Sequence, residues 1–411
     1  MSGVEFEWVM TMSDKSAAMS GQLQAELVIV GGGIMGLWAA LKAERRGIDA
    51  ILIDGERAGS GASGGLLGAL MAHMPDRWNE KKQLQFDGLV SLEVEIAGLE
   101  AETGLSAGYR RCGRLIPLPK PHLRPIAERH SQEAGTNWQQ KGRVFDWAVI
   151  EESPWAGWPS RSFCEAGLVH DGFAGRVSPR ALIAALRAGL AQTVRVRVLE
   201  GAAVQSIDAS AGRLTLADGS SVGFGNLLVA AGVGSFPLLE ALGPAPAKPL
   251  GRGVKGQAAL LKVDLLDDLP LLYLDGLYVV PHEGGHVAIG STSENQFSTA
   301  FSTDGLLDAL IVEARQLAPV LETALVVERW AGLRPKAVDR DPMVGPHPEH
   351  ARVHALTGGF KVSFGIAHLL ADAALDAISG QALPLPDSFS LAHHVSVAAH
   401  RVADTGFAET P

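Results

Sequence analysis

The segment at positions 27–54 constrains the fold of this chain more than any other part of its sequence. It reads LVIVGGGIMGLWAALKAERRGIDAILID and opens with a short apolar run, which suits a buried parallel strand. Glycines follow at once in the G-x-G-x-x-G spacing, at Gly31, Gly33 and Gly36. Gly31 permits a tight turn, Gly33 lets the backbone approach a pyrophosphate, and Gly36 lets the next helix pack on the strand. The pattern predicts a strand that turns sharply into a helix.

The remainder of this segment completes a dinucleotide-binding unit. A helix is predicted from Ile34 to about Arg46, and Gly47 ends it. Phosphate oxygens are favoured at the start of such a helix, where N–H groups are free and the dipole is positive. A second apolar strand over 48–53 leads to Asp54, whose carboxylate is placed to accept hydrogen bonds from ribose hydroxyls. The unit predicts a bound adenine dinucleotide, against the alternative that the glycines only form a tight turn.

Asp54 narrows the choice of dinucleotide. Its negative charge would repel the 2′-phosphate of NADP, so NADP is disfavoured in this unit. FAD and NAD both remain compatible with these residues.

The composition disfavours several classes of protein. The 411 residues carry a formal net charge of −10 and no basic run, so binding of nucleic acid is not expected. Cys112 and Cys164 are too few for a disulfide framework, and we therefore expect a reducing compartment, the cytoplasm. No stretch of about 20 apolar residues predicts a transmembrane segment.

The order of the predicted elements argues against one continuous sheet. Nucleotide-type patterns occupy 25–85 and 170–240, a further strand-to-helix pattern occupies 352–380, and unlike material separates them. We therefore expect a nucleotide-binding domain assembled from separate segments, with a second, antiparallel-sheet domain between them. The expected bounds are a disordered leader at 1–24, a nucleotide-binding domain at 25–88, 165–248 and 336–390, a substrate domain at 89–164 and 249–335, and a flexible tail at 391–411.

Motifs spread along the whole chain share their order with one family of flavoproteins. They are VGGGIMGLWAA with Asp54, the GSGASGG loop, DGFAGRVSPRALIAAL, AAG at 230–232, VKGQ at 254–257, YVVP at 278–281, WAGLRP at 330–335 and ALTGGFKVSFGIAHLLADAAL. From 26 to about 390 the chain resembles the FAD-dependent D-amino acid oxidase superfamily, in its branch of glycine oxidases, sarcosine oxidases and related amine dehydrogenases. The resemblance implies FAD rather than NAD. It also implies an α/β fold, with a Rossmann-like FAD-binding domain built from discontinuous segments and an antiparallel-sheet α+β substrate domain.

The resemblance also implies which residues hold the FAD. The pyrimidine end of the flavin would lie against the turn at 357–365, where N–H groups at a helix start stabilise the negative charge of the reduced ring. Lys361 would add a cation, although related sequences often carry an arginine in a shorter turn. Val204 would meet the adenine through its backbone, and Ser63 the pyrophosphate. The expected cofactor-binding residues are Gly31, Gly33, Ile34, Met35, Gly36, Asp54, Gly55, Ser63, Gly64, Val204, Ala231, Gly232, Gly358, Gly359, Phe360 and Lys361.

The expected catalytic residues are Arg334, Tyr278 and Lys361. The resemblance implies that Arg334 clamps the substrate carboxylate at two points, a task that suits a planar guanidinium. Tyr278 would donate a hydrogen bond to the same carboxylate. A structural salt bridge for Arg334 and an ordinary core position for Tyr278 are the alternatives.

The histidines give no prediction of a metal site, because they lack a defined ligand geometry. We expect the following to be surface or turn residues: His282, His286, His347, His350 and His354. His73 follows the glycine-rich loop, and in some relatives a histidine in that neighbourhood is attached to the flavin. We expect no such attachment here.

The implied reaction is oxidation of the C–N bond of a small amino acid or N-methyl amino acid. The substrate is bound through its own carboxylate with its amine neutral, and a hydride passes from its alpha carbon to flavin N5 without a dedicated base. Water then hydrolyses the resulting imine. Oxygen or another acceptor then takes the electrons, and the sequence is compatible with a homo-oligomer. One alternative is a dehydrogenase of a 2-hydroxy acid or amine that serves a quinone or carrier. Another is a flavin-binding subunit of a heteromeric amine dehydrogenase.

Overall fold

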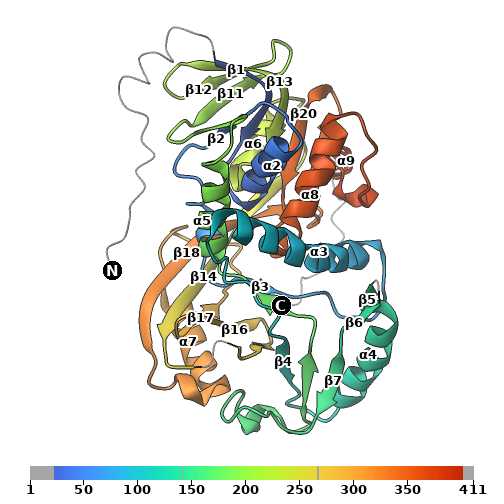
Figure 1. The fold of residues 1–411 in the computed structure, drawn as a ribbon, viewed down its shortest axis with the longest axis vertical. Helices are drawn as coiled ribbons and strands as arrows, with labels where there is room; N and C mark the ends of the chain where they lie inside the picture. Colours follow the sequence, from blue (N-terminus) through green and yellow to red (C-terminus); the bar gives the residue numbers. More distant parts are fainter. Residues whose placement is uncertain (1–22, 141, 266–267, 401–411) are drawn as a thin grey trace.

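Two β-sheets, one above the other in Figure 1, organise the structure. The computed structural model describes residues 23–140, 142–265 and 268–400. The long helix α3 (Glu80–Thr103) crosses the molecule between the sheets (Figure 1). Asn79 caps its first turn through a side-chain oxygen, and Gly104 ends it in the left-handed conformation.

The first sheet is of the dinucleotide-binding type. Its central strands lie in the order β10-β2-β1-β13, and β13 also pairs with β20 and β12. The pairs among the first four strands and between β13 and β20 are parallel. Alternate residues of β1 belong to two different core clusters, one on each face, which explains its continuous apolar sequence. The strands are β1 (Leu23–Val30), β2 (Ala50–Ile53), β10 (Val196–Leu199), β11 (Val204–Asp208), β12 (Arg213–Leu216), β13 (Ser221–Val229), β19 (Met343–His347) and β20 (His350–Thr357).

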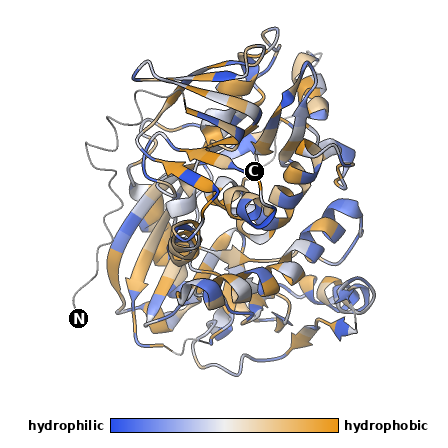
Figure 2. Ribbon diagram, turned by 45° about the horizontal axis from the view of Figure 1, so that its top comes forward, coloured by the Kyte–Doolittle hydropathy of each residue, from blue (hydrophilic) through white to orange (hydrophobic). Residues whose placement is uncertain are grey.

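The second sheet is mostly antiparallel, in the order β18-β14-β17-β16-β15-β4-β8-β7. One face packs on α7 (Gly305–Leu317), and the other faces the first domain through a small apolar cluster. Figure 2 shows hydrophobic residues along the strands of both sheets. The strands are β4 (Arg114–Pro117), β7 (Trp147–Ile150), β8 (Leu168–Asp171), β14 (Gly251–Lys262), β15 (Leu271–Leu274), β16 (Leu277–His282), β17 (His286–Gly290) and β18 (Leu325–Ala337).

The helices α2 (Ile34–Arg45) and α8 (Ser363–Ile378) pack on each other against the first sheet, and α3 and α5 (Pro179–Leu190) join them. Ser178 caps α5 and Pro179 occupies its first turn. None of the helices in the described part of the chain is long and apolar enough to span a bilayer. The remaining elements are β3 (Ala69–Leu70), β5 (Gln139–Gln140), β6 (Arg143–Val144), β9 (Gly175–Arg176), α4 (Leu123–Asn137), α6 (Ser235–Glu240) and α9 (Leu391–Ala399).

The predicted fold class is confirmed, and several predicted boundaries differ from the structure. The tail expected at 391–411 begins as helix α9, because Ser390 caps it and its apolar residues pack near β19; positions 401–411 lie outside the described residues. Likewise β1 begins at Leu23, and the rest of the expected leader lies outside the described residues. Most of α3 falls in the stretch expected to be substrate domain. Its apolar face packs on α5 and α8 of the nucleotide-binding domain instead.

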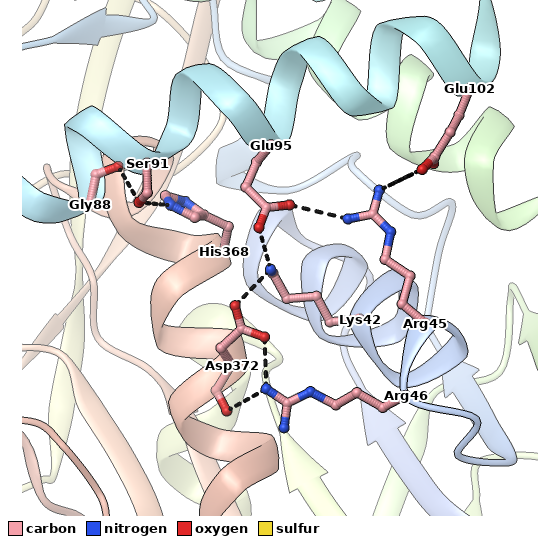
Figure 3. Close-up of polar contacts among 9 residues, drawn as sticks. All are labelled: Lys42, Arg45, Arg46, Gly88, Ser91, Glu95, Glu102, His368 and Asp372. Atoms are coloured by element: carbon pink, nitrogen blue, oxygen red, sulfur yellow. Dashed lines mark hydrogen bonds and ion pairs between the residues drawn. The ribbon is translucent and has the colours of Figure 1, made fainter.

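A network of ion pairs ties α2 to α3 and α8 (Figure 3). The ammonium of Lys42 lies 2.7 Å from Glu95 of α3 and 2.6 Å from Asp372 of α8. Arg45, the last residue of α2, and Arg46, its C-cap, extend the network on its exposed side. The side chain of Lys42 is only 7% exposed, so it is the buried centre of the network.

We expect Lys42→Met to destabilise the protein. Both carboxylates would lose their buried partner, but they remain partly open to water, so we expect a loss of about 1–3 kcal/mol in the free energy of unfolding. Arg45→Met is the matched control on the same helix, and its exposed ion pairs predict a loss of about 0–1 kcal/mol. Denaturant unfolding measures both. A Lys42→Met loss no larger than that of the control would contradict the role of this network.

Candidate active site

A cavity of about 1150 Å³ lies between the two sheets. Its wall includes the ends of β1 and β2, the glycine-rich loop after β2, the start of α8 and one face of the second sheet. This volume is at or above the upper end of the usual range for a small-molecule site. The cavity can therefore hold a large ligand together with a smaller one.

The glycine turn at one end of the cavity excludes side chains. Gly31 has a φ of +108°, and a Cβ there would lie 2.5 Å from backbone atoms of Ala230. A Cβ on Gly36 would lie 1.8 Å from the carbonyl oxygen of Gly31. These close approaches bring the first turn of α2 against β1, and the N–H groups of that turn face the cavity.

The start of α2 has the donors that an anion requires. The N–H groups of Met35 and Gly36 have no hydrogen-bond partner among the described residues. The N–H of Ile34 donates to Oγ of Ser63 at 2.9 Å. Beside the turn, Asp54 accepts a 2.6 Å hydrogen bond from the N–H of Gly32. A negative ligand group fits the helix start, and hydroxyl groups fit Asp54.

The start of α8 supplies a second set of free donors. The N–H groups of Lys361, Ser363 and Phe364 lack hydrogen-bond partners in the described part of the chain, and all three residues line the cavity. Phe360, in the same turn, has a φ of +44°. This end of the cavity also favours partial negative charge.

Arg334 of β18 reaches the cavity across β14. Its guanidinium passes over Gly256, where a Cβ would lie 2.9 Å from Cζ. Nη1 donates to Oγ of Ser291 at 3.0 Å, and Nη2 donates to the carbonyl of Thr292 at 2.7 Å. Ser291 follows Gly290, whose register partner is Tyr278, and the guanidinium interacts electrostatically with the Tyr278 side chain.

A cluster of ion pairs around the buried Lys255 fixes the segment after β17, which accepts the hydrogen bonds of Arg334. Lys255 of β14 is 1% exposed, and its ammonium lies 3.5 Å from Glu294 and 3.0 Å from Asp304. The backbone of Lys255 exchanges two hydrogen bonds with that of Glu294. Hydrogen bonds from Gln257 and Lys255 lower the pKa of Asp304 to about 2. The carbonyl of Thr292 is thereby held in place beneath the guanidinium of Arg334.

Two cations of this site have no carboxylate partner in the described residues. Neither Arg334 nor Lys361 forms an ion pair, and both lie near the ring of Phe360, at 5.3 and 5.6 Å from its centroid. Burial, with the charges of Arg334 and Lys336, lowers the pKa of Lys361. Burial also raises the pKa of the Tyr278 hydroxyl. This end of the cavity therefore attracts an anion.

Comparison with known proteins assigns the chain to a family. The model of the family described as FAD dependent oxidoreductase matches residues 26–373. This chain belongs to that family of FAD-dependent oxidoreductases. It is therefore an enzyme, and FAD is its cofactor.

Relatives of this oxidoreductase include two curated glycine oxidases. The protein of Bacillus licheniformis is 26% identical over 86% of this chain and 93% of its own length. That of Pseudomonas putida is 28% identical over 87% and 95%. The glycine oxidase of Geobacillus kaustophilus has the same fold, with a TM-score of 0.80 at 21% identity over 90% of this chain and 99% of its own. Iminodiacetate oxidase of Chelativorans gives 0.76 at 20% identity over 89% and 98%.

The cavity of this oxidoreductase fits FAD. The free N–H group of Met35 would hold the pyrophosphate, and Asp54 would hold the ribose. The free N–H groups at the start of α8 would contact the flavin pyrimidine. Met35 and the residues at the start of α8 line the same cavity, as a dinucleotide requires.

Most of the predicted cofactor-binding residues line this cavity, and four glycines do not. Gly36, Gly64, Gly358 and Gly359 lie behind its wall, where they allow segments to approach closely. A Cβ on Gly359, for example, would lie 2.4 Å from Cε of Met35. The predicted residues in the wall are Gly31, Gly33, Ile34, Met35, Asp54, Gly55, Ser63, Val204, Ala231, Gly232, Tyr278, Arg334, Phe360 and Lys361.

Several residues of the wall were not predicted. One of them, Tyr273, could have been found, because the Asp275-Gly276 turn signals a hairpin that pairs Tyr273 with Tyr278. No local pattern points to Arg114, which reaches the cavity only because β4 lies next to β15. The unpredicted polar and aromatic residues of the wall include Arg114, Tyr273, Ser291 and Trp330.

The expectation that the histidines are surface or turn residues is wrong for three of them. His282, His347 and His354 are buried. His282 contacts the carbonyl oxygens of Leu66 and Leu67 through Nε2, and burial lowers its pKa to about 4. It thus fixes the loop that lines the cavity. No group of three metal-ligating side chains lies together in the described ranges, and His73 lines the cavity.

Proposed function

We propose that this FAD enzyme oxidises the C–N bond of a small amino acid or N-methyl amino acid. The observation that carries the proposal is the guanidinium of Arg334, which lies near Tyr278 in the cavity without a carboxylate partner in the described chain. A planar guanidinium and a phenol suit the carboxylate of such a substrate. The glycine oxidases among the relatives support this substrate class.

The residues of the site position the substrate rather than react with it. Bound FAD supplies the acceptor for the hydride. Arg334 and Tyr278 orient the substrate through its carboxylate, so that its amine-bearing carbon points toward the flavin position. The carboxylates in the cavity wall are those of Asp54 and Glu56, which follow β2 at the nucleotide end. The proposal accordingly assigns no carboxylate as a general base.

Anaerobic reduction of the flavin tests the substrate class. The panel contains glycine, sarcosine, D-amino acids, proline analogues and 2-hydroxy acids, and bleaching of the flavin absorbance is the readout. We expect reduction by one or more amino acids. Reduction by hydroxy acids alone would overturn the proposal in favour of a hydroxy acid dehydrogenase, and reduction by no compound would favour a subunit that needs a partner.

The electron acceptor, the oligomeric state and the location of the enzyme stay predictions. Hydrogen peroxide formed under air during turnover would identify oxygen as the acceptor, and its absence would favour a quinone or a carrier protein. Light scattering measures the predicted homo-oligomer. Cell fractionation tests the expected cytoplasmic location.

The binding of a carboxylate should weaken at alkaline pH through Lys361. Lysine is charged below its pKa, and the pKa of Lys361 is lowered from its ordinary value of 10.5 by burial and by Arg334 and Lys336. We expect the affinity for acetate, which is ionised throughout, to fall roughly tenfold as the pH rises through this lowered pKa. Perturbation of the flavin spectrum measures it. Lys361→Met should remove the pH dependence, and an unchanged dependence would contradict the role of Lys361.

A further inference from the structure

The cavity wall carries a second polar site beyond the carboxylate site of Arg334 and Tyr278. Tyr273 of β15 is the register partner of Tyr278, and the two ring centroids lie 4.9 Å apart. Beyond it, Arg114 of β4 lies opposite Leu271, two residues from Tyr273 on the same strand. Leu271 belongs to the apolar cluster on the cavity side of the sheet. Arg114 and both tyrosines therefore line the same wall.

Arg114 has hydrogen-bonding capacity that the protein does not use. Its side chain is 2% exposed, and Nη2 donates to Oδ2 of the fully buried Asp171 at 2.6 Å. Nη1 contacts only the thioether sulfur of Met71, at 3.2 Å, which is a weak acceptor, and Nε has no partner. A buried guanidinium normally has its donors satisfied, and an unsatisfied donor is costly.

Asp171 explains the orientation of Arg114 but does not account for its spare donors. Oδ1 of Asp171 accepts from the N–H groups of Phe173 and Ala174, at 2.8 and 3.1 Å. Asp171 is thus held by the backbone, and it holds one side of the guanidinium of Arg114. Cζ of Arg114 lies 5.9 Å from the ring centroid of Tyr273.

The tyrosine hydroxyls of this wall are also unused. The hydroxyl groups of Tyr273 and Tyr278 have no hydrogen-bond partner among the described residues, although both residues line the cavity. The third tyrosine of the chain, Tyr109, lies outside the cavity wall and accepts from Nη2 of Arg111 at 3.2 Å. The unpaired hydroxyls are therefore confined to the cavity.

We propose that Arg114 and Tyr273 form a second subsite that binds a carboxylate at the far end of the substrate. The preferred substrate is then an amino acid with a second carboxylate, carried on its side chain or on its amine. This proposal rests on the proposed function and names its substrate class. The strand of Arg114 lies two strand spacings, ~10 Å, from that of Tyr278. Glycine and sarcosine are too short to reach both subsites.

The charges of the cavity agree with a dianionic ligand. Arg334 and Lys361 carry no carboxylate partner in the described chain, while Asp171 offsets the charge of Arg114. The carboxylates in the wall, Asp54 and Glu56, belong to the nucleotide end. The acid beside the second subsite is Asp171, which is paired with Arg114 and lies outside the wall, so a second carboxylate meets donors in this part of the cavity.

A pair of unreactive acids tests the subsite in the FAD-loaded enzyme. Glutarate and valerate have the same five-carbon chain, and only glutarate has a second carboxylate. Their dissociation constants follow from the perturbation of the flavin spectrum and from the rise in Tm. Hydrogen bonds to a charged group predict that glutarate binds roughly 10- to 100-fold more tightly than valerate.

The three tyrosines provide matched variants, each of which removes one hydroxyl. Tyr273→Phe should reduce the preference for glutarate over valerate, by roughly fivefold. Tyr278→Phe should weaken both acids, and Tyr109→Phe should change neither. Arg114→Lys keeps a charge beside Asp171 but loses the fork of donors, and it should also reduce the preference. Thermal unfolding shows that each variant is folded.

Equal binding of glutarate and valerate would overturn the subsite. The subsite would also be overturned if the preference for glutarate over valerate were the same in Tyr273→Phe as in Tyr109→Phe. These results do not depend on turnover, so they are separate from the flavin-reduction panel. If glycine reduces the flavin while the two acids bind equally, the subsite is wrong and the proposed function stands.

Discussion

Arg334→Ala should lower kcat/KM for the amino acid substrate by roughly 100- to 1,000-fold, with the effect mainly in KM. The physical reason is the loss of two charge-assisted hydrogen bonds to the carboxylate in a partly buried site. Arg334→Lys keeps the charge but not the planar fork, so it should recover only part of the loss. Steady-state kinetics with the best substrate of the panel measures the effect, and FAD absorbance shows that the cofactor remains bound.

Arg329 provides a control on the same strand. Its guanidinium pairs with Asp308 on the surface, away from the cavity wall. Arg329→Ala should therefore leave KM and kcat unchanged. If Arg334→Ala behaves like this control, Arg334 is not a carboxylate clamp.

Gly36→Ala should produce protein that has lost most of its FAD. The added Cβ would lie 1.8 Å from the carbonyl oxygen of Gly31, a backbone atom that cannot move without opening the glycine turn. Overpacking of this kind costs about 1–3 kcal/mol or more, which corresponds to a loss of roughly 10- to 100-fold in FAD affinity if the strain is expressed there. The ratio of flavin to protein absorbance after gel filtration is the measurement.

Gly98 is the matched helical glycine. A Cβ at this position of α3 would meet no atom within 4 Å. Gly98→Ala should therefore retain FAD and increase stability, by up to about 1 kcal/mol, because alanine favours the helix. Full FAD content in Gly36→Ala, as in this control, would show that close helix packing is not required for the cofactor site.

The nucleotide end of the site could be predicted because its signal is local. The turn from Gly31 to Gly36 depends on residues a few positions apart, and Asp54 follows the next strand. The structure places the predicted turn, strands and helix start together, as this spacing requires. Oγ of Ser63 accepts from the N–H of Ile34, and its contact with the pyrophosphate stays a prediction.

The substrate end was predictable only in part. The resemblance pointed to Arg334 and Tyr278, which occur in short motifs. Arg114 has no such motif, and its place in the wall depends on parallel pairing between β4 and β15, which are more than 150 residues apart in sequence. Single-sequence patterns do not specify such non-local pairing.

The boundaries of the domains were likewise predictable only in part. The helical pattern of α3 is evident in the sequence, but its assignment to the nucleotide-binding domain follows from packing on α5 and α8. The apolar residues of α9 do not by themselves predict a packed helix, because their packing partner, β19, is known only from the structure. Local periodicity predicts an element, and tertiary contacts determine its partner.

By itself the sequence determined that this protein holds an adenine dinucleotide and, through its ordered motifs, that the dinucleotide is FAD. It could do so because a tight glycine turn and a helix start are set by neighbouring residues. Only the tertiary structure decided what faces the substrate. Sheet register brings Arg334 beside Tyr278 and places Tyr273 and Arg114 along the same wall, and register depends on hydrogen bonds between distant strands.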